Sequence, residues 1–337
     1  MKKIISLLLV SLMLLLAFAG CADDQGTNTS DVSDTSSVDE KTKIRIAGMK
    51  GPTSIGLVGI MEDDSNGTAK NDYEFAIKGA ADEISPLLIK GELDIAAVPA
   101  NLASVLYNRT QGKIKLLAVN NLGVLYIVTK GEEITSIADL KGKTILSTGK
   151  GTTPEYTLRS LLSKNGIDPD KDVTIEFKTE ATEVVAQMAK SETAIAMLPQ
   201  PYVTVASGKV QGLKVSLDLN EEWKKVNNGS SIVTGVIVAR DEFIKNNPEA
   251  VKKFLEEFKA SAEKVNSDVK ASAQLVEKFG IFAADVAEKA IPQCNITYIA
   301  GEDMKTPVNT YLGVLYEQNP QSVGGNLPKD DFFYIAE

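Results

Sequence analysis

Short apolar runs alternate along the chain with longer stretches in which apolar residues recur at helical spacing. The short runs predict β-strands, and the longer periodic stretches predict amphipathic helices. The expected strands are residues 43–48, 73–78, 94–98, 113–119, 123–130, 143–147, 173–178, 194–198, 213–217 and 231–239, with a break at Asn120-Asn121. The expected helices are residues 53–63, 82–90, 101–110, 153–165, 181–190, 269–279, 283–290 and 302–318, with others from about Tyr202 and from Pro248. Strands and helices in alternation predict an α/β fold with mostly parallel sheets that are covered on both faces.

The stretch from residue 43 to residue 61 combines a strand, a glycine turn and the start of a helix. Gly51-Pro52 punctuates the chain after the strand, and Thr53 or Ser54 can cap the helix that follows. A turn of this kind gathers free backbone N–H groups and the positive end of a helix dipole at one point. Such a point suits a small anionic or polar ligand.

The same arrangement returns one hundred residues later, which indicates an internal repeat. Residues 143–148 predict a strand, residues 149–151 form a Gly-Lys-Gly turn, and a helix opens with Pro154 near its first position. Residues 81–100 align without a gap to residues 181–200, and seven of the twenty positions are identical. A strand–helix–strand unit built twice explains the likeness. The alternative is that any α/β unit produces a similar spacing. We expect Pro99 and Pro199 to end equivalent strands.

The N-terminus carries the pattern of an export signal. Lys2 and Lys3 precede an apolar run that is shorter than a typical membrane-spanning helix. The run ends at small residues before Cys21. This pattern predicts a lipoprotein signal peptide at residues 1–20, lipid on Cys21, and a chain held at the extracytoplasmic face of the cell membrane. The alternative is an ordinary secretory signal followed by an incidental cysteine. Residues 21–42 are rich in Ser, Thr and Asp and predict a disordered acidic tether.

Composition excludes several classes of function. The formal net charge is −9 and no basic cluster interleaves with aromatic residues, so nucleic acid is not an expected partner. The chain has no histidine, which removes the Ser-His-Asp triad, the Cys-His pair and the usual zinc sites. Cys294 is the only cysteine besides Cys21, so no internal disulfide is expected. Composition leaves glycosidase-like chemistry open, but the paired carboxylates Asp63-Asp64 and Asp330-Asp331 stand beside polar turn residues, which predicts that they are solvated. We expect no catalytic residues, no metal and no cofactor.

Two segments carry a resemblance to a known family. Residues 137–143 read Ile-Ala-Asp-Leu-Lys-Gly-Lys ahead of a Gly/Thr turn and a helix that ends in Gly166-Ile167, and residues 327–334 read Leu-Pro-Lys-Asp-Asp-Phe-Phe-Tyr. In these elements the chain resembles the solute-binding lipoproteins of ABC importers, in the branch with nitrate, aliphatic sulfonate, taurine and thiamine-precursor binders. The resemblance implies the class II periplasmic-binding-protein fold. It also implies a monomer that binds a small-molecule solute and works with an ABC permease and its ATPase.

The resemblance further implies two lobes with the solute between them. Lobe 1 is expected at residues 43–120 and 238–337, and lobe 2 at residues 121–237. Crossing segments are expected near residues 119–123 and within residues 223–238. Family ligands are met by loops after the strands, here residues 49–55, 99–102, 148–156 and 199–202. The candidate ligand contacts are Lys50, Thr53, Ser54, Ile55, Asn101, Asn121, Thr152, Thr153, Tyr156, Gln200 and Tyr202.

Each candidate also has a plainer structural explanation. Thr53, Thr152 and Thr153 can serve as helix N-caps, turn lysines are usually solvated, and Trp223, in a polar patch, can be a packing residue. The chain holds only four arginines and no histidine, so an arginine clamp for a strongly charged ligand has few candidates. A neutral or zwitterionic solute is at least as plausible. An extracytoplasmic enzyme or a ligand sensor on the same scaffold is the alternative to an importer component.

Overall fold

The structure is a computed structural model that describes residues 41–336. The expected signal peptide, Cys21 and the expected tether up to residue 40 lie outside the described residues. Among the helices of residues 41–336, none combines the length and the apolar character that a membrane crossing requires.

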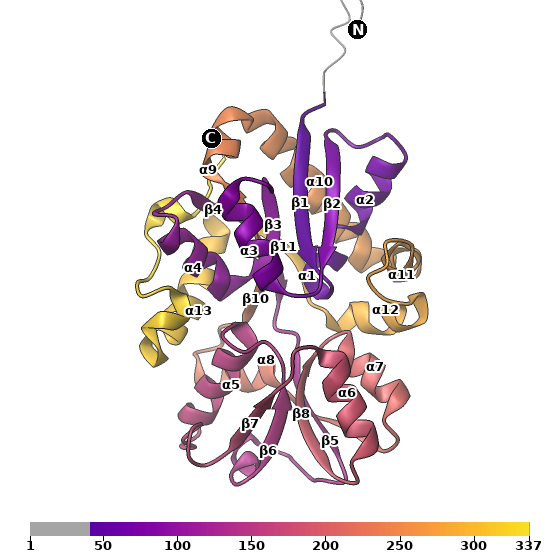
Figure 1. The fold of residues 1–337 in the computed structure, drawn as a ribbon, viewed down its shortest axis with the longest axis vertical. Coiled ribbons are helices and arrows are strands. Elements are labelled where there is room, and N and C mark those ends of the chain that lie inside the picture. The colour runs from indigo at the N-terminus through magenta and orange to yellow at the C-terminus, as the bar shows by residue number, and fades with distance from the viewer. Residues whose placement is uncertain (1–40, 337) are drawn as a thin grey trace, which may run out of the picture. The chain divides into compact units, whose positions relative to one another are not determined.

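The strands of the described residues form two sheets (Figure 1). The first sheet has six strands, and its central strands pair antiparallel while β1 pairs parallel with both of its neighbours. Its strand order is β11 (Ile296–Ala300), β4 (Ile114–Leu122), β10 (Val233–Arg240), β3 (Ile95–Pro99), β1 (Lys43–Met49) and β2 (Asp72–Lys78). The second sheet has five strands in the order β7 (Thr174–Phe177), β6 (Thr144–Ser147), β8 (Ala194–Pro199), β5 (Leu125–Lys130) and β9 (Leu213–Asp218).

The two sheets repeat one pattern of pairing. In each sheet a strand with a parallel neighbour on both sides (β1 or β6) is followed by the strand that ends in proline, β3 or β8. An antiparallel strand then follows, β10 beside β3 and β5 beside β8. Pro99 and Pro199 therefore end equivalent strands, and the repeat predicted from residues 81–100 and 181–200 is confirmed. The predicted α/β class is confirmed as well, with sheets that are mixed because β10 and β5 run against their neighbours.

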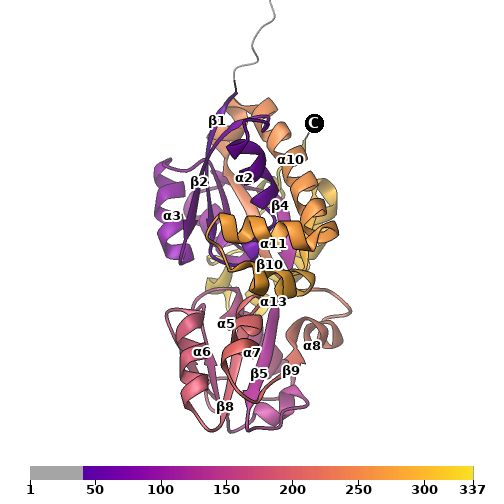
Figure 2. The ribbon, with the colours of Figure 1, turned by 90° about the vertical axis from the view of Figure 1, so that its right-hand side faces the viewer.

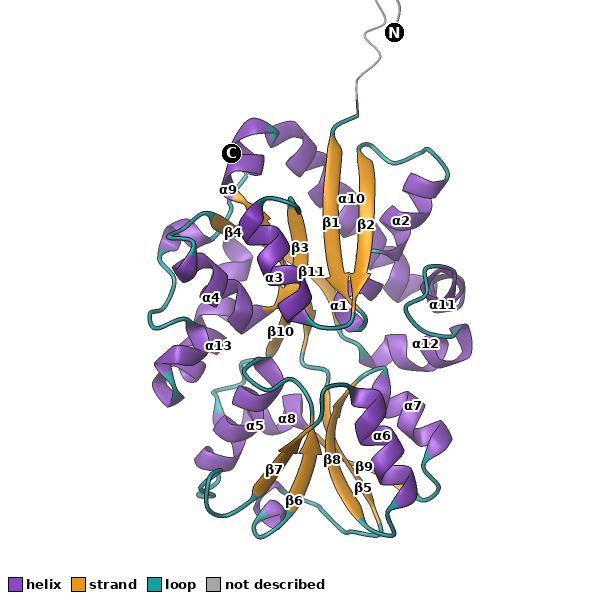
Figure 3. Ribbon diagram, in the orientation of Figure 1, coloured by secondary structure: helices purple, strands orange, loops and turns teal. Residues whose placement is uncertain are grey.

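The helices lie against both faces of each sheet (Figures 2 and 3). We call the first sheet with its helices lobe 1 and the second sheet with its helices lobe 2. The helices of lobe 1 are α1 (Pro52–Ile55), α2 (Val58–Ser65), α3 (Ala81–Lys90), α4 (Ala100–Arg109), α9 (Asp241–Asn246), α10 (Pro248–Ser267), α11 (Val269–Lys278), α12 (Ala284–Ala290) and α13 (Lys305–Gln318). The helices of lobe 2 are α5 (Thr153–Lys164), α6 (Ala181–Lys190), α7 (Tyr202–Lys209) and α8 (Leu219–Val226). Short 3-10 helices occupy Ile137–Leu140, Ile291–Gln293, Gly301–Met304, Pro320–Val323 and Asp330–Phe332.

The chain changes from one sheet to the other in two places. The first sheet keeps β4 through Leu122, and the second sheet begins with β5 at Leu125. The return reaches the first sheet at Val233, where β10 begins. Residues 121–122 and 233–237 thus belong to strands of the first sheet, although the expected lobe boundaries assigned them to the second. Asn120 and Asn121 lie inside β4 and do not break it.

Three further elements differ from the sequence prediction. The helix expected at residues 53–63 is two helices, because the Ser261 hydroxyl of α10 donates to the Gly56 carbonyl and accepts from the Gly59 N–H. The polar patch around Trp223 is helix α8, whose first turn is capped by the Asp218 carboxylate. The segment that forms β11 was not predicted as a strand.

Candidate functional site

The carboxyl ends of β3 and β6 bring two loops from different lobes into contact. The Asn101 side chain, just after β3, donates to the Gly151 carbonyl at 3.4 Å and to the Ser322 carbonyl at 3.0 Å. The Thr153 hydroxyl, at the start of α5, donates to the Asn101 side-chain oxygen at 3.2 Å. Ligands in open α/β sheets bind beyond the carboxyl ends of strands, so this meeting of loops is the candidate site.

Aromatic side chains extend the contact between α5, α8 and α13. The Thr157 hydroxyl of α5 and the Tyr311 hydroxyl of α13 are 2.9 Å apart. Tyr311 also packs against Trp223 of α8, with 5.3 Å between the ring centroids. Burial raises the pKa of the Tyr311 phenol, against the opposing effect of hydrogen bonds with Thr157 and Thr153. The phenol is therefore neutral and serves as a hydrogen-bonding group between the lobes.

A second set of contacts joins the lobes on the side of α7 and α12. The Gln200 amide, just after β8, donates to the Gln293 side-chain oxygen at 2.7 Å, and Gln200 is almost fully buried. The Tyr202 ring meets the Phe282 ring edge-on, with the centroids 5.2 Å apart. Gln200 and Tyr202 were predicted contacts, and both lie where the lobes meet.

Polar side chains also tie the two crossing segments to each other. The Asn220 side-chain oxygen accepts from the Ile232 N–H at 2.9 Å. A Cβ added to Gly123 would lie 2.5 Å from the same oxygen, so the two segments pass close together at this glycine. Asn295 completes the junction, since its side chain donates to the Gly123 carbonyl at 2.5 Å and its carbonyl accepts from the Leu122 N–H at 3.1 Å.

Three polar side chains gather beside Gly235, where the strands of lobe 1 reach the crossing segments. We call Thr53, Asn120 and Asn121 the polar cluster. A Cβ added to Gly235 would lie 2.2 Å from Asn121 Oδ1, 2.5 Å from Asn120 Oδ1 and 2.8 Å from Thr53 Cγ2. Within residues 41–336, the hydroxyl oxygen of Thr53 and the Oδ1 atoms of both asparagines are buried without a hydrogen-bond partner. Buried polar atoms are normally paired, so this cluster is an unsatisfied group of atoms at the candidate site.

The turn after β1 contributes less than the sequence predicted. Ile55 is fully buried in the core beneath α10, Ser54 donates its hydroxyl to the Met49 carbonyl at 2.6 Å, and Lys50 is exposed. Ile55 and Ser54 are therefore used within lobe 1, whereas ligand contact by Lys50 stays a prediction. Thr53 remains a candidate contact. It does not cap a helix, because α1 begins without any side-chain cap.

The turn after β6 already holds an anion of its own. The Glu155 carboxylate accepts from the Gly151 N–H at 2.7 Å and pairs with Arg159 at 2.8 Å. Thr152 donates its hydroxyl to the Gly149 carbonyl, and no side chain caps α5. The alternative explanation of Thr152 and Thr153 as caps is therefore wrong. Thr153 faces Asn101, whereas Thr152 is used within its own turn.

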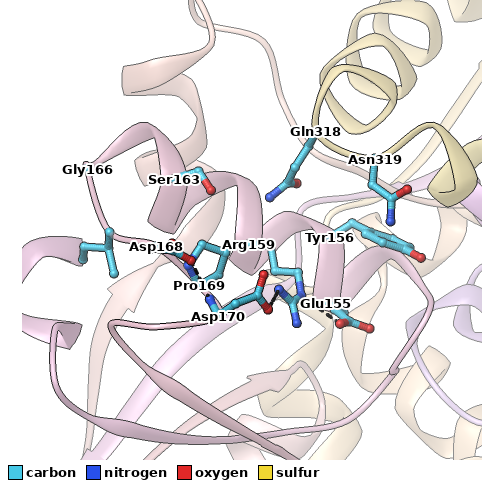
Figure 4. A pocket seen from close by; sticks show the side chains of 11 residues that line it. Glu155, Tyr156, Arg159, Ser163, Gly166, Asp168, Pro169, Asp170, Gln318 and Asn319 are labelled. Atoms are coloured by element: carbon cyan, nitrogen blue, oxygen red, sulfur yellow. Dashed lines mark hydrogen bonds and ion pairs between the residues drawn. The ribbon is translucent and has the colours of Figure 1, made fainter.

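Tyr156 lies outside this meeting of loops. It lines a polar hollow of about 630 Å³ between α5, the loop at residues 166–170 and the end of α13 (Figure 4). Arg159 in this hollow is held by Glu155 and, at 2.7 Å, by Asp170. A smaller hollow of about 370 Å³ lies between α7 and α12. Among the described residues, no group of three or more His, Cys, Asp or Glu side chains could hold a metal ion.

The structure thus brings Thr53, Asn101, Asn121, Thr153, Gln200 and Tyr202 to the region where the lobes meet and places Ile55 in the core. Ligand contact by the six residues stays a prediction. The structure adds residues that the sequence did not point to, among them Asn120, Tyr311 and Gln293. Asn120 sits beside the predicted Asn121, but the pair looked like a strand break. Tyr311 and Gln293 come from elements far along the chain, and nothing in their local sequence indicated their position.

Known proteins are similar to this chain in sequence. The model of the family described as NMT1/THI5 like matches residues 82–268. A Brucella abortus protein named as a binding protein is 30% identical over 173 residues, which are 50% of this chain and 52% of that protein. The chain therefore spans about half the length of the curated relatives it matches.

Solved structures resemble the chain over more of its length. A crystal structure of an ABC transporter from Parabacteroides distasonis superposes with a TM-score of 0.74 at 25% identity, covering 88% of this chain and 100% of that one. The periplasmic aliphatic sulphonate-binding protein of Escherichia coli superposes with a TM-score of 0.70 at 16% identity, covering 88% and 94%. The fold is thus the periplasmic-binding-protein-like fold that the sequence resemblance implied.

Proposed function

Because the chain belongs to the NMT1/THI5-like family, we propose that it is the lipid-anchored, extracytoplasmic solute-binding component of an ABC importer. In this proposal a monomer captures a small organic solute between lobes 1 and 2 and delivers it to a permease that works with an ATPase. Binding without catalysis is supported by the similar proteins, which are named for binding and for ABC transport.

One observation carries the proposal. The loop beyond β3 of lobe 1 and the loop beyond β6 of lobe 2 meet through Asn101 and Thr153, beside a cluster of buried polar atoms that have no partner among the described residues. Two lobes joined by two short crossings can separate to admit a solute and then come together around it. Contacts made only when the lobes are together favour that state, and a solute that adds to them shifts the population toward it.

The test of solute binding is a thermal-shift screen on the purified full-length chain. A solute present at a hundred times its dissociation constant stabilises the folded state by about 2.7 kcal/mol, which raises the melting temperature by several degrees. The panel contains sulfonates, carboxylates, amines, pyrimidines and vitamins. A solute that stabilises the chain and is recovered unchanged after long incubation supports a binding component, whereas conversion of the solute would support the enzyme alternative.

The anchor is tested separately. A lipid on Cys21 would hold the chain at the membrane surface, as the signal pattern in residues 1–20 predicts. Replacing Cys21 with Ser is expected to move the exported chain from the membrane fraction to the soluble fraction. If the Cys21→Ser chain stays with the membrane to the same extent, the lipid anchor is wrong, and the solute-binding proposal stands unaffected.

A further inference from the structure

The free atoms of the polar cluster are acceptors. The Asn120 amide nitrogen donates to the Thr53 carbonyl at 2.8 Å, and a carbonyl can only accept. This bond fixes the orientation of the Asn120 amide, so the atom left without a partner is the oxygen. The Asn121 amide nitrogen faces the Leu122 carbonyl at 3.4 Å, which leaves its oxygen free in the same way.

The two free oxygens lie close together, packed against Gly235. Both lie within 2.5 Å of the position that a Cβ on Gly235 would take, and the methyl carbon of Thr53 lies 2.8 Å from it. Two amide oxygens this close repel each other, and each has lost its hydration, because Asn120 is 1% exposed and Asn121 is 0% exposed. A donor group that hydrogen-bonds to both oxygens removes both costs at once.

The charged side chains nearby do not favour an anion. The Glu155 carboxylate already accepts a hydrogen bond from the Gly151 N–H. Arg159, which pairs with Glu155, also pairs with Asp170. Arg45 and Arg240 are both bound to Asp94, at the end of lobe 1 where β3 begins. Lys50 and Lys150 are exposed to solvent. An oxyanion would therefore meet free acceptors and a buried carboxylate, with no buried cation among these residues to balance its charge.

We propose, on the premise that the chain binds a solute between its lobes, that this solute presents an amino group to the side-chain oxygens of Asn120 and Asn121. The solute is neutral or cationic and is not a simple oxyanion. The amino group donates one hydrogen bond to each oxygen.

The experiment measures binding to the full-length chain for two sets of probes. The first set pairs amino compounds with analogues that lack the amino group: adenine with purine, 4-aminopyrimidine with pyrimidine, and propylamine with propanol. The second set contains oxyanions: nitrate, sulfate and methanesulfonate. We expect at least one amino compound to bind, its analogue without the amino group to bind at least about tenfold more weakly, and the oxyanions not to bind.

Three variants locate the effect. Asn120→Leu is expected to weaken binding of the amino compound by about tenfold or more. Asn121→Asp keeps the size of the side chain, loses only a long hydrogen bond, and is expected to tighten binding of a cationic amine. Asn71→Leu is the matched control, because Asn71 is equally buried, also has an unpartnered Oδ1 atom, and lies at the opposite end of the first sheet beside Tyr73 and Ala250. It is expected to lower stability and leave the affinity unchanged.

The outcomes separate this inference from the proposed function. If an oxyanion binds better than every amino compound, the inference is overturned and the solute-binding function survives. If an amino compound binds but neither Asn120→Leu nor Asn121→Asp changes its affinity, the inference is again overturned. If Asn120→Leu does not fold, Asn121→Asp alone decides. If no probe of either set binds, the inference is overturned, and the thermal-shift screen alone decides the proposed function.

Discussion

The hydroxyl of Thr153, in lobe 2, donates a hydrogen bond of 3.2 Å to the side-chain oxygen of Asn101, in lobe 1. Both side chains are almost completely buried, so the bond exists only while the lobes are in contact. The turn after β6 lies nearby as well, because the Gly151 carbonyl also accepts from Asn101. The pair is therefore a direct link between lobe contact and the loops that we propose to surround a solute.

Replacing Thr153 with Val removes this bond and keeps the shape of the side chain. We expect the affinity for the solute found in the thermal-shift screen to fall by about threefold to tenfold, because one neutral hydrogen bond of the closed state is lost. The matched control is Thr129→Val, since Thr129 is equally buried but bonds to Ser216 at 2.9 Å within lobe 2. Isothermal titration should show a weaker complex for the first variant only, and equal losses in both would argue against a role for lobe contact.

The fluorescence of Trp223 reports whether the two lobes are in contact. Trp223 is the only tryptophan of the chain, is fully buried, and packs against Tyr311 of the other lobe. Separation of the lobes would expose part of its ring, so adding a bound solute is expected to move the emission to shorter wavelength. Tyr311→Leu should remove most of the shift, because the ring then has no partner across the lobes. A solute that binds tightly without any change in emission would contradict this use of Trp223.

Asp94 makes a prediction about pH that is independent of the solute. Burial alone would raise the pKa of its carboxyl, but hydrogen bonds from Arg45 and Arg240 outweigh burial and hold that pKa below its usual value. A lowered pKa in the folded state contributes stability above the unfolded-state pKa of about 4, and this stability is lost as the pH falls through the folded pKa. Asp94→Asn should cost about 2 kcal/mol at pH 7 and flatten the loss of stability below about pH 4.

Chemical unfolding of the parent and of Asp94→Asn at several pH values measures this effect. The solute affinity of the variant should stay unchanged at pH 7, because Asp94 starts β3 and the candidate site lies beyond its end at Pro99. If the free energy of unfolding falls with pH in the same way for both chains, the ion pairs of Asp94 do not govern stability in acid.

Gly123 tests the junction of the two crossing segments. An alanine here would bring its Cβ to 2.5 Å from Asn220 Oδ1, the atom that accepts the Ile232 N–H. We expect Gly123→Ala to lower the free energy of unfolding by about 1–3 kcal/mol, because the tie between the segments must move. Gly208→Ala in α7 is the control, since nothing lies within 4 Å of its Cβ, and it should raise stability by about 0.5–1 kcal/mol. If Gly123→Ala leaves the free energy of unfolding unchanged, the contact between Gly123 and Asn220 does not constrain the two crossing segments.

The fold could largely be predicted because its signals are local. Alternation of apolar runs and periodic stretches located most strands and helices, and the likeness of residues 81–100 to residues 181–200 revealed the equivalent strands that end in Pro99 and Pro199. The errors have a non-local cause. Residues 53–63 read as one helix, yet Ser261 of a distant helix divides them. Asn120 and Asn121 read as a break, yet pairing with β10 keeps them in a strand.

The candidate site was less predictable for the same reason. Loops after strands could be predicted as a group, and Asn101, Thr153 and Gln200 follow from that rule. Their partners could not, because Ser322, Tyr311 and Gln293 reach the site only through the packing of elements that follow much later in the chain. The local sequence also gave no sign that the Glu155 carboxylate would accept the hydrogen bond from the Gly151 N–H. This N–H is therefore not free to bind an anionic ligand, as the turn had suggested.

The central claim is that the two lobes come together around a solute, and the distance between residues 50 and 150 tests it most directly. Lys50 and Lys150 are exposed and lie in the turns after β1 and β6, one in each lobe. Spin labels on Lys50→Cys and Lys150→Cys, in a Cys21→Ser chain whose Cys294 is buried, report that distance by pulsed electron resonance. We predict a shorter and narrower distance distribution when the solute is added at saturating concentration. A distribution that is unchanged by a solute bound at one molecule per chain would contradict the account.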